Sequence, residues 1–373
     1  MKKSVAILGT RGYPSYYGGF ETAVRKLAPY LVEAGWDVTV YGRPGSVVDD
    51  DPTLDSRVRT VTTPGLQTRS LSSLTFGLTS MLSASVRKPD VALIMNVANG
   101  YWLPLMQLRD IPTVLNVDGM EWERDKWGPL AKAVFIGGAK ATARWVDIAV
   151  FDSLAIESRW KADFGREGRF IPYGGDPAPP LPLEPGFSHR GYVLVVARFV
   201  PENSMEIFFD AVEDLAEKWP VVLVGSSGYG GPLEDRAADL AARFNGVTWL
   251  GHVRDDRRLL ALWQHAGAYF HGHSVGGTNP ALVQAMAVGA PTVARDTLYN
   301  REVLGTAGVF TAPSSAAIVS AISDLMSNPE LQERLSHDVA ARANDVYSWD
   351  SVCQSYELAL EQAMTLRPQK VPA

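Results

Sequence analysis

Short apolar runs alternate with longer amphipathic stretches along the whole chain. Most of the short runs are near-continuous in Val, Ile and Leu, as expected for parallel strands that are covered on both faces. The expected strands are Ser4–Thr10, Asp37–Arg43, Arg57–Thr63, Val91–Ala98, Thr113–Val117, Asp147–Asp152, Tyr192–Phe199, Val221–Gly225, Val247–Trp249, Ala268–His271 and Pro291–Ala294. Helical periodicity falls between them, for example in Glu21–Ala34, Leu130–Trp145, Met205–Lys218 and Ala281–Val288. The pattern predicts an α/β fold that occurs twice.

A proline-rich segment separates the two halves of this pattern. Asp176–Gly186 reads DPAPPLPLEPG and has five prolines in eleven residues, so it can form neither a central strand nor a helix. We therefore expect one domain over residues 1–176 and a second over 187–346. Residues 347–373 form a last helix, strongest over Ser351–Met364, which could cross back to the first domain.

Composition limits the class of protein. The chain has 373 residues, 46% of them hydrophobic, and a single cysteine, so disorder and a disulfide scaffold are excluded. The net charge of −6 argues against a nucleic-acid partner. Residues 1–180 carry 21 basic and 19 acidic side chains, against 14 and 22 in the rest. With no signal peptide and no long apolar stretch, we expect a cytoplasmic protein.

The loop after the first strand is rich in glycine. It runs from Gly9 to Thr22 as GTRGYPSYYGGFET, and the glycine pair Gly18 and Gly19 precedes an expected helix. Free N–H groups at such a helix start can bind an anion, although the pair could also make only a tight turn. The loop contains neither the dinucleotide fingerprint G-x-G-x-x-G nor a P-loop, so the two commonest reasons for such a loop are excluded.

Two segments of the second half place polar groups at expected strand ends. Arg198 follows the first strand of its domain, where a guanidinium can contact a diphosphate; pairing with Glu202 or Glu206 is the alternative. The segment His271–Pro280, HGHSVGGTNP, opens a helix and forms a second possible anion cradle. Acidic and cysteine partners are missing near its two histidines, so we expect no metal site.

These motifs together resemble a known family. The chain is similar to glycosyltransferase family four, and in particular to a rhamnosyltransferase-like branch whose first domain begins G-T-R-G-x-P-x-x-Y-G-G-F-E-T. The likeness continues through Val117–Trp122 (VDGMEW) with Lys126-Trp127, then His271–Pro280, and Asn300–Gly305 (NREVLG). The motifs occur in the right order over nearly the full chain.

The resemblance implies a fold and a reaction. The fold would be GT-B, with two Rossmann-like domains facing a central cleft. The activity would be retaining, metal-independent sugar transfer without a cofactor, with the donor bound mainly by the second domain and the acceptor by the first. The branch implies dTDP-rhamnose as donor, with a UDP-sugar as the other possibility. It also implies a glycan or polyprenyl-diphosphate-linked acceptor at the inner face of the plasma membrane, in cell-surface polysaccharide synthesis.

The resemblance also assigns site residues. We expect Arg198, Asp118 and Glu121 to be catalytic: Arg198 would stabilise the leaving diphosphate, and Asp118, or else Glu121, would orient the acceptor. The expected donor-binding residues are Gly18, Gly19, Arg198, Asn203, Gly225, His252, His271, Gly276, Gly277, Thr278, Asn279 and Gln284. The expected acceptor-binding residues are Tyr13, Tyr17, Asp118, Glu121 and Trp122.

Two departures from the family pattern stand out. Asn203 takes the place of a lysine, so one cation is lost from the expected diphosphate site, although an amide can still donate a hydrogen bond. Gly276 and Gln284 take the places of two glutamates, of which the second ordinarily binds the ribose hydroxyls. We interpret Gln284 as suited to a deoxyribose, which fits a thymidine donor.

Other functions remain open from the sequence. The main alternative is a non-catalytic protein that binds sugar nucleotides or glycans. A GT-B-type epimerase would need paired acid and base carboxylates, which the second-domain loops lack. An NADP-dependent oxidoreductase is suggested only by Arg43 at the end of the second strand. Peripheral membrane contact is a further hypothesis, because Leu130–Trp145 combines Lys132, Lys140 and Arg144 with apolar residues, although an ordinary packed helix explains the pattern as well.

Overall fold

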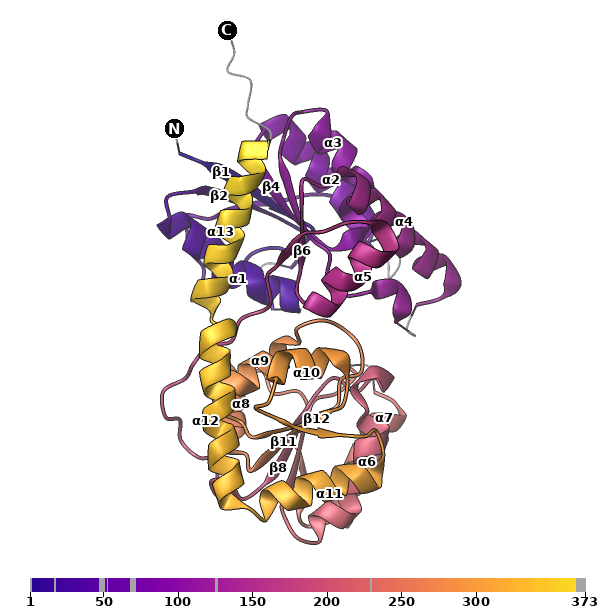
Figure 1. Ribbon diagram of the computed structural model, residues 1–373, viewed down its shortest axis with the longest axis vertical. Helices are drawn as coiled ribbons and strands as arrows, with labels where there is room; N and C mark the ends of the chain where they lie inside the picture. Colours follow the sequence, from indigo (N-terminus) through magenta and orange to yellow (C-terminus); the bar gives the residue numbers. More distant parts are fainter. Residues whose placement is uncertain are drawn as a thin grey trace. The chain divides into compact units, whose positions relative to one another are not determined.

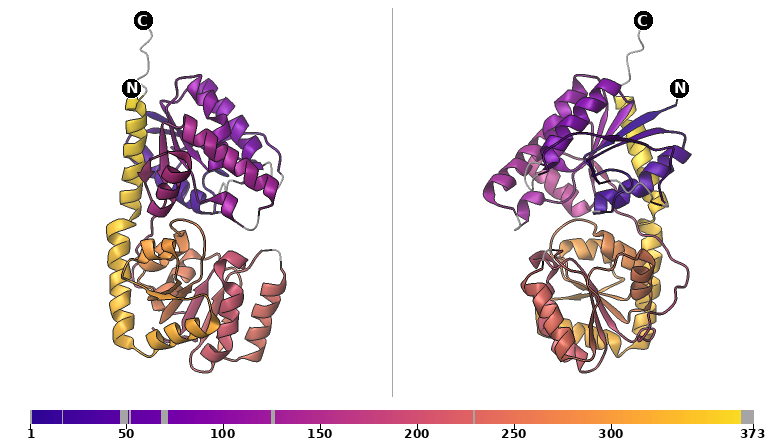
Figure 2. Two further views of the ribbon diagram at one scale, coloured as in Figure 1. Left: turned by 45° about the vertical axis from the view of Figure 1, so that its right-hand side comes forward. Right: turned by 180° about the vertical axis from the view of Figure 1, so that it is seen from behind.

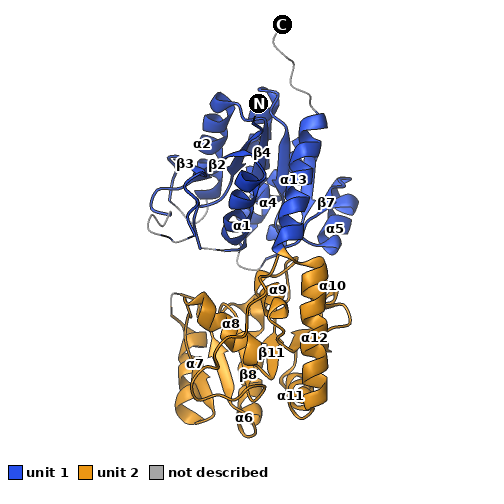
Figure 3. Ribbon diagram, turned by 90° about the vertical axis from the view of Figure 1, so that its left-hand side faces the viewer, with its two compact units in different colours: residues 1–173, 349–373 blue, residues 174–348 orange. Residues whose placement is uncertain are grey.

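The computed structural model describes residues 2–16, 18–46, 51, 53–67, 72–124, 127–228 and 230–366. The chain divides into two compact units, shown in Figure 3: unit 1 contains residues 1–173 and 349–373, and unit 2 contains residues 174–348. The chain therefore passes from one unit to the other twice, at Tyr173 and again at Ser348. Each unit is a doubly wound α/β domain, so the predicted fold class is confirmed.

Unit 1 is built on a seven-stranded parallel sheet in the order β3-β2-β1-β4-β5-β6-β7 (Figure 1). Its strands are β1 Ser4–Leu8, β2 Asp37–Gly42, β3 Arg59–Thr62, β4 Val91–Met95, β5 Thr113–Asn116, β6 Ile148–Phe151 and β7 Arg169–Phe170. Val5 of β1 pairs with Val38 on one side and Val91 on the other. The central strands are buried on both faces, which is why their sequences lack a polar alternation.

The described part of unit 1 has six α-helices: α1 Gly19–Glu33, α2 Ser72–Arg87, α3 Leu103–Gln107, α4 Pro129–Trp145, α5 Leu154–Phe164 and α13 Trp349–Leu366. It also has the 3₁₀ turns η1 Val97–Trp102 and η2 Glu121–Glu123. Helices α1 and α13 pack side by side against one face of the sheet, where α13 covers β4 and β5. Right-handed crossovers place the helices between the later strands on the other face. The C-terminal helix therefore supplies cover that the local connections leave out.

Unit 2 repeats this plan on a six-stranded parallel sheet in the order β10-β9-β8-β11-β12-β13. Its strands are β8 Val193–Val196, β9 Val221–Val224, β10 Val247–Trp249, β11 Ala268–His271, β12 Thr292–Arg295 and β13 Val309–Thr311. Its helices are η3 Pro201–Asn203, α6 Met205–Ala216, α7 Pro232–Arg243, α8 Asp256–His265, α9 Pro280–Ala287, α10 Leu298–Leu304, α11 Ser315–Met326 and α12 Pro329–Val346. Helices α6, α7 and α11 share one core cluster, and α8, α9 and α10 share the other. Two further views of the ribbon are given in Figure 2.

The sequence pattern identified eleven strands, and the structure has all of them. It missed the edge strands β7 and β13, which have two and three residues, because runs so short and only partly buried carry little pattern. The proline-rich segment is not the point where the units meet. It belongs to unit 2, since Asp176 and Leu181 are hydrogen-bonded to Gln284 and Gln264, so the division lies at Tyr173, three residues before the predicted boundary.

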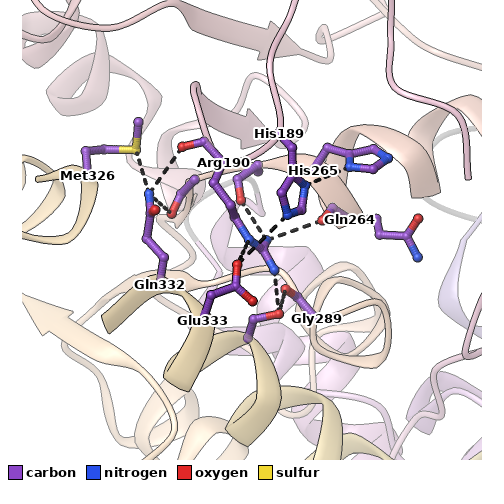
Figure 4. A network of polar contacts seen from close by, with 11 residues as sticks. His189, Arg190, Gln264, His265, Gly289, Met326, Gln332 and Glu333 are labelled. Carbon is purple, nitrogen blue, oxygen red and sulfur yellow. Dashed lines mark hydrogen bonds and ion pairs between the residues drawn. The ribbon is translucent and has the colours of Figure 1, made fainter. Parts of the chain in front are cut away.

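Arg190 fixes the start of unit 2 to its last helix, as Figure 4 shows. The guanidinium donates to the carbonyls of Gln264 (3.3 Å) and Ala266 (2.9 Å) and to Ser336 Oγ (2.5 Å), and it pairs with Glu333 at 3.2 Å. Burial lowers the pKa of Arg190 from its usual value, and the ion pair with Glu333 opposes that shift. The network joins the segment before β8, the end of α8 and helix α12 into one rigid body.

Candidate active site

The loops after the strands of unit 2 converge at the carboxyl edge of its sheet, which is where open α/β sheets bind ligands. Gly225, after β9, donates its N–H to the carbonyl of Gly251, after β10, at 2.7 Å. Ser204 Oγ, after β8, donates to the carbonyl of Gly272, after β11, at 2.6 Å. The Ser274 N–H donates to the Glu202 carbonyl at 2.8 Å. The four loops are thus joined in two pairs at this edge.

Arg198 lies in the first of these loops with an exposed side chain. Its carbonyl accepts hydrogen bonds from Asn203 Nδ2 and from the Val200 N–H, both at 2.9 Å, so its backbone is fixed while the guanidinium faces solvent. Among the described residues no ion pair joins Arg198 to Glu202 or Glu206. An accessible guanidinium on a fixed backbone can bind an anion at this edge.

Asn203 differs from its expected role. Its side chain is 3% exposed, and its Nδ2 is used on the Arg198 carbonyl. Because the amide is buried inside the loop, it does not offer a donor to a diphosphate in place of the missing lysine. Asn203 instead positions Arg198.

Gly225 permits the close approach of two loops. It has a φ of +129°, and a Cβ there would lie 1.8 Å from the Ala197 carbonyl oxygen, next to Arg198. Only glycine fits such a backbone conformation and such a contact. Gly225 therefore shapes the site through its backbone. His252, in the next loop, is exposed at the same edge.

His271 is a core residue, contrary to its expected contact with the donor. It is 1% exposed, and its Nδ1 lies 3.0 Å from the Tyr269 hydroxyl. The ring stacks on His273, with centroids 4.3 Å apart and planes at 11°. Burial, and then the neighbouring His273, hold the pKa of His271 well below its ordinary value, so the ring is neutral at pH 7.

This burial predicts a pH dependence of stability. The pKa of His271 is lowered on folding, so below pH 6.5 the unfolded chain binds a proton that the folded chain does not, and stability falls. Between pH 7.5 and 5.5 we expect wild type to lose about 1.4 kcal/mol more unfolding free energy than His271→Gln. Denaturant unfolding at both pH values measures it. His337→Gln, at a side chain that is 84% exposed, is the control and should follow wild type.

Helix α9 begins at the same edge. Asn279 caps it, since its Oδ1 accepts from the Ala281 N–H at 2.9 Å, and Pro280 takes the first helical position. Before the cap, Gly276 has a φ of +109°, with no atom within 4 Å of an added Cβ, and Thr278 is buried. The segment with Gly276 and Gly277 thus approaches the helix start as an open glycine turn, which suits an anion cradle.

Gln284 does not face a ribose site in this structure. Its Nε2 donates to the Asp176 carbonyl at 2.8 Å, and its Oε1 accepts from the Asp176 N–H at 3.1 Å. Both ends of the amide are therefore used to hold the start of the proline-rich segment. The interpretation of Gln284 as a deoxyribose contact stays a prediction, and such a contact would have to replace the hydrogen bonds to Asp176.

In unit 1, the glycine-rich first loop is packed tightly. Tyr13 is 0% exposed and donates its hydroxyl to the Thr53 carbonyl at 3.3 Å, so it supports the loop and does not face an acceptor. Gly18 is extended, and Gly19 starts α1, where a Cβ would lie 3.1 Å from the Tyr173 ring. Tyr17 lies outside the described residues.

The start of α1 already faces a negative charge. Glu21 is 6% exposed, and its Oε1 accepts from the Arg11 N–H at 3.1 Å. Its Oε2 lies 3.5 Å from the position of a Cβ on Gly18. A carboxylate at a helix N-terminus is stabilising, and its negative charge would repel a bound phosphate. The geometry thus gives α1 less room for an anion than α9.

Asp118 follows β5 at the carboxyl edge of unit 1. It is half-buried, with a left-handed φ of 64°, and its N–H donates to Asn116 Oδ1 at 2.9 Å. The nearby hydroxyl of Tyr173 is fully buried; burial first, and then the charges of Asp118 and Asp152, raise the pKa of Tyr173 well above its usual value. A strained loop fixed by Asn116 presents Asp118 where an acceptor could contact it.

Glu121 and Trp122 are structural. Glu121 is 4% exposed; Oε1 pairs with Arg124 Nε at 2.7 Å, and Oε2 accepts from Trp127 Nε1 at 2.8 Å. Trp122 packs against Trp160 and Phe164, with ring centroids 6.3 and 5.8 Å away. Both expected acceptor contacts instead hold the loop after β5 in place. A buried glutamate with two partners is not poised to act as a base.

One feature of unit 1 was missed from the sequence. A cavity of about 300 Å³ lies at the ends of β1 and β2 and is lined in part by Arg11 and Arg43. The sequence signal was present, since Arg11 directly follows the first expected strand and Arg43 ends the second. Among the described residues, no group of three or more His, Cys, Asp or Glu side chains could hold a metal ion. Within the same residues no helix is long and apolar enough to cross a bilayer.

Comparison with known proteins gives matches for both units. Residues 18–174 match the model of the glycosyl transferase 4-like domain, and residues 185–341 match that of glycosyl transferases group 1. A phosphatidyl-myo-inositol mannosyltransferase of Mycobacterium leprae is 32% identical over 232 residues, which are 58% of this chain and 59% of that protein. The match thus spans about three fifths of the curated relative.

Solved structures resemble the chain over nearly its whole length. Sucrose-phosphate synthase from Thermosynechococcus elongatus has a TM-score of 0.80 at 17% identity, covering 98% of this chain and 100% of that one. Anabaena HepE, solved in complexes with UDP and with UDP-glucose, has a TM-score of 0.72 at 17% and 16% identity, covering 97% of this chain and 100% of that one. At these identities the likeness concerns the fold.

Proposed function

We propose that this chain, which has the GT-B fold and whose two units belong to the glycosyl transferase 4-like and glycosyl transferases group 1 domain families, transfers a sugar from a nucleotide-diphosphate donor to an acceptor. Unit 2 binds the donor and unit 1 binds the acceptor. The observation that carries the proposal is the exposed Arg198, held by Asn203 at the carboxyl edge of unit 2, with the capped start of α9 at the same edge.

The chemistry follows from the leaving group. The barrier to glycosyl transfer lies in separating an oxocarbenium-like sugar from a diphosphate, on which negative charge develops. Arg198 and the N–H groups at the start of α9 stabilise that charge in the transition state more than in the ground state. The departing phosphate takes the acceptor proton, so the anomeric configuration is retained and no protein nucleophile or metal is required. Asp118 orients the acceptor hydroxyl.

The proposed donor is dTDP-rhamnose, and the proposed acceptor is a polyprenyl-diphosphate-linked sugar at the inner face of the plasma membrane. The first-loop motif Gly9–Thr22 supports it. Membrane contact would use α4, where Leu130 is 81% exposed and Lys140 and Arg144 are exposed as well. A basic helix with an exposed apolar residue at its start suits an anionic leaflet.

A non-catalytic nucleotide-sugar binder is the second candidate. Two observations favour it: Asn203 supplies no cation at the diphosphate site, and Gln284 is occupied by the backbone of Asp176. A protein with these two features could still bind a donor through one guanidinium and one helix N-terminus. It would lack the additional charged side chains that promote departure of the diphosphate. A measurement of donor turnover distinguishes the transferase from the binder.

Thermal unfolding in the presence of nucleotides tests the proposal. We expect dTDP, UDP and their sugar conjugates to raise the midpoint, because a ligand at 100 times its Kd stabilises the folded state by about 2.7 kcal/mol. NADP should leave the midpoint unchanged. Slow hydrolysis of the donor without acceptor would then support the transferase, whereas binding with no hydrolysis would support the binder. A shift with NADP alone would contradict both.

A further inference from the structure

Arg295 ends β12 at the carboxyl edge of unit 2, and its guanidinium reaches across the neighbouring strand. Its Nη1 donates to Ser204 Oγ at 2.9 Å. Ser204 lies in the loop after β8, and its Oγ donates in turn to the carbonyl of Gly272, which directly follows β11, at 2.6 Å. Because β11 lies between β8 and β12 in the sheet, the guanidinium lies beside the end of β11. Arg295 therefore brings a second cation to the edge at which Arg198 lies.

The backbone of Arg295 is fixed by a residue of the NREVLG segment. Asn300 is buried, and its Nδ2 donates to the Arg295 carbonyl at 2.8 Å and to the His273 carbonyl at 3.0 Å. One amide thus joins the end of β12 to the segment that leads into α9. This contact gives the segment Asn300–Gly305, which has no role in the proposed function so far, a place at the same edge.

One side of the Arg295 guanidinium is available to a ligand. Within the described ranges Arg295 forms no ion pair, and the adjacent Asp296 is paired with Arg301 at 2.5 and 2.8 Å. Its Nη1 is used on Ser204, whereas its Nε and Nη2 make no hydrogen bond in this part of the chain and are not enclosed. Nε and Nη2 form one edge of the planar group, which can donate two parallel hydrogen bonds to a phosphate.

The position of Arg295 also relates to the missing lysine. Asn203 stands where the family pattern has that lysine, and its amide is buried against the Arg198 carbonyl. The next residue, Ser204, is the one that Arg295 contacts. A cation from β12 thus reaches the loop from which a cation has been lost. Two guanidinium groups at one edge suit a ligand with two phosphate groups.

We propose that Arg295 is the second cation of the donor site and that it binds the diphosphate together with Arg198, in place of the missing lysine. This inference rests on the proposed function for the donor being a nucleotide-diphosphate sugar. The binding of a diphosphate at the two arginines does not depend on it. Arg198, with its exposed guanidinium, supplies the larger part of the charge, and Arg295, which shares one nitrogen with Ser204, supplies the smaller part.

Calorimetric titration of the full chain with inorganic pyrophosphate, and separately with UDP and dTDP, tests this assignment. We expect Arg295→Gln to weaken the binding of pyrophosphate and of the nucleotides by about tenfold, which corresponds to about 1.4 kcal/mol. The affinity of this variant should also vary less with salt concentration than that of wild type, because one screened charge contact is lost. Arg295→Met keeps the aliphatic stem and is the second neutral variant if the glutamine variant does not fold.

Two control variants separate ligand binding from a structural role. Arg334→Gln removes an exposed arginine of α12 beside Glu333, which pairs with Arg190 before β8, so it changes the charge at the opposite edge of the sheet and should bind as wild type does. Ser204→Gly removes the hydroxyl that Arg295 contacts, at a left-handed φ of 57° where glycine fits. It leaves both guanidinium groups in place and should lose less affinity than Arg295→Gln.

The outcomes distinguish this inference from the proposed function. Pyrophosphate and nucleotide binding that Arg295→Gln leaves unchanged would overturn the inference alone. Equal losses in Arg295→Gln and Ser204→Gly would also overturn it, because the arginine would then act only by holding two loops together. Pyrophosphate binding that depends on Arg295, without any nucleotide binding, would support the inference and defeat the proposed function. If wild type binds neither pyrophosphate nor nucleotide, both are wrong.

Discussion

Arg198→Ala is expected to lower kcat/KM for sugar transfer by about 10²–10³-fold, the range found when a preorganised donor to a developing charge is removed. Arg198 is exposed at the end of β8, and its carbonyl is fixed by Asn203 and Val200, so its backbone is in place before the donor binds. Because a lysine is missing from the position of Asn203, we expect Arg198 to supply most of the side-chain charge at this edge. Steady-state kinetics with a dTDP- or UDP-sugar measures the effect.

Two variants control this experiment. Arg243→Ala removes an arginine from the last turn of α7, which is paired with Asp239 at 3.2 Å, and should leave kcat/KM unchanged. Arg198→Lys keeps the charge without the planar fork and should fall between wild type and alanine. A kcat that falls at unchanged KM places the interaction in the transition state. Transfer that is unaffected in Arg198→Ala would exclude the proposed diphosphate site.

The strands could be predicted because buried parallel strands leave a direct signature in sequence. Residues of β4 and β9 are buried at every position, so each reads as one apolar run. Strands β7 and β13 lack that signature because they have only two and three residues and are only partly buried. Local pattern therefore identifies long buried strands more readily than short, partly exposed ones.

Whether a functional residue could be assigned from sequence depends on where its partners lie. Arg198 could be placed from sequence because its position depends only on the end of one strand. The roles of Tyr13, Glu121 and Gln284 could not, because each depends on a partner distant in space or in the loop: the Thr53 carbonyl, the Arg124 and Trp127 side chains, and the backbone of Asp176. A motif shows which side chain is present, but it does not show which group that side chain is hydrogen-bonded to in the folded chain.

The same reasoning applies to the cavity of unit 1. Arg11 and Arg43 are 32 positions apart in the chain, and they meet only because β1 and β2 are adjacent in the sheet and Gly12 lies against Gly42. Arg43 alone suggested an NADP site, whereas in the structure Arg43 and Arg11 line one small cavity together. Pairs across strands become visible once strand order is known.

Gly225→Ala is expected to lower the unfolding free energy of unit 2 by about 3 kcal/mol or more and to weaken nucleotide binding at the same time. A methyl group there would lie 1.8 Å from the Ala197 carbonyl oxygen, and the φ of +129° is rarely adopted by L-residues. The steric contact and the unfavourable φ both destabilise the folded state. Relief of the contact requires the ends of β8 and β9 to move apart. Arg198 follows Ala197, so that movement displaces the guanidinium.

Gly251→Asn separates the cost of the backbone conformation from the cost of the steric contact. Gly251 has a φ of +62° with no atom within 4 Å of an added Cβ, and asparagine tolerates left-handed backbone better than most residues. We therefore expect a cost below about 1 kcal/mol and normal nucleotide binding for this control. Denaturant unfolding and nucleotide titration compare the two variants. If Gly225→Ala is as stable as Gly251→Asn, the ends of β8 and β9 are not held in contact, and Arg198 has no rigid support from this side.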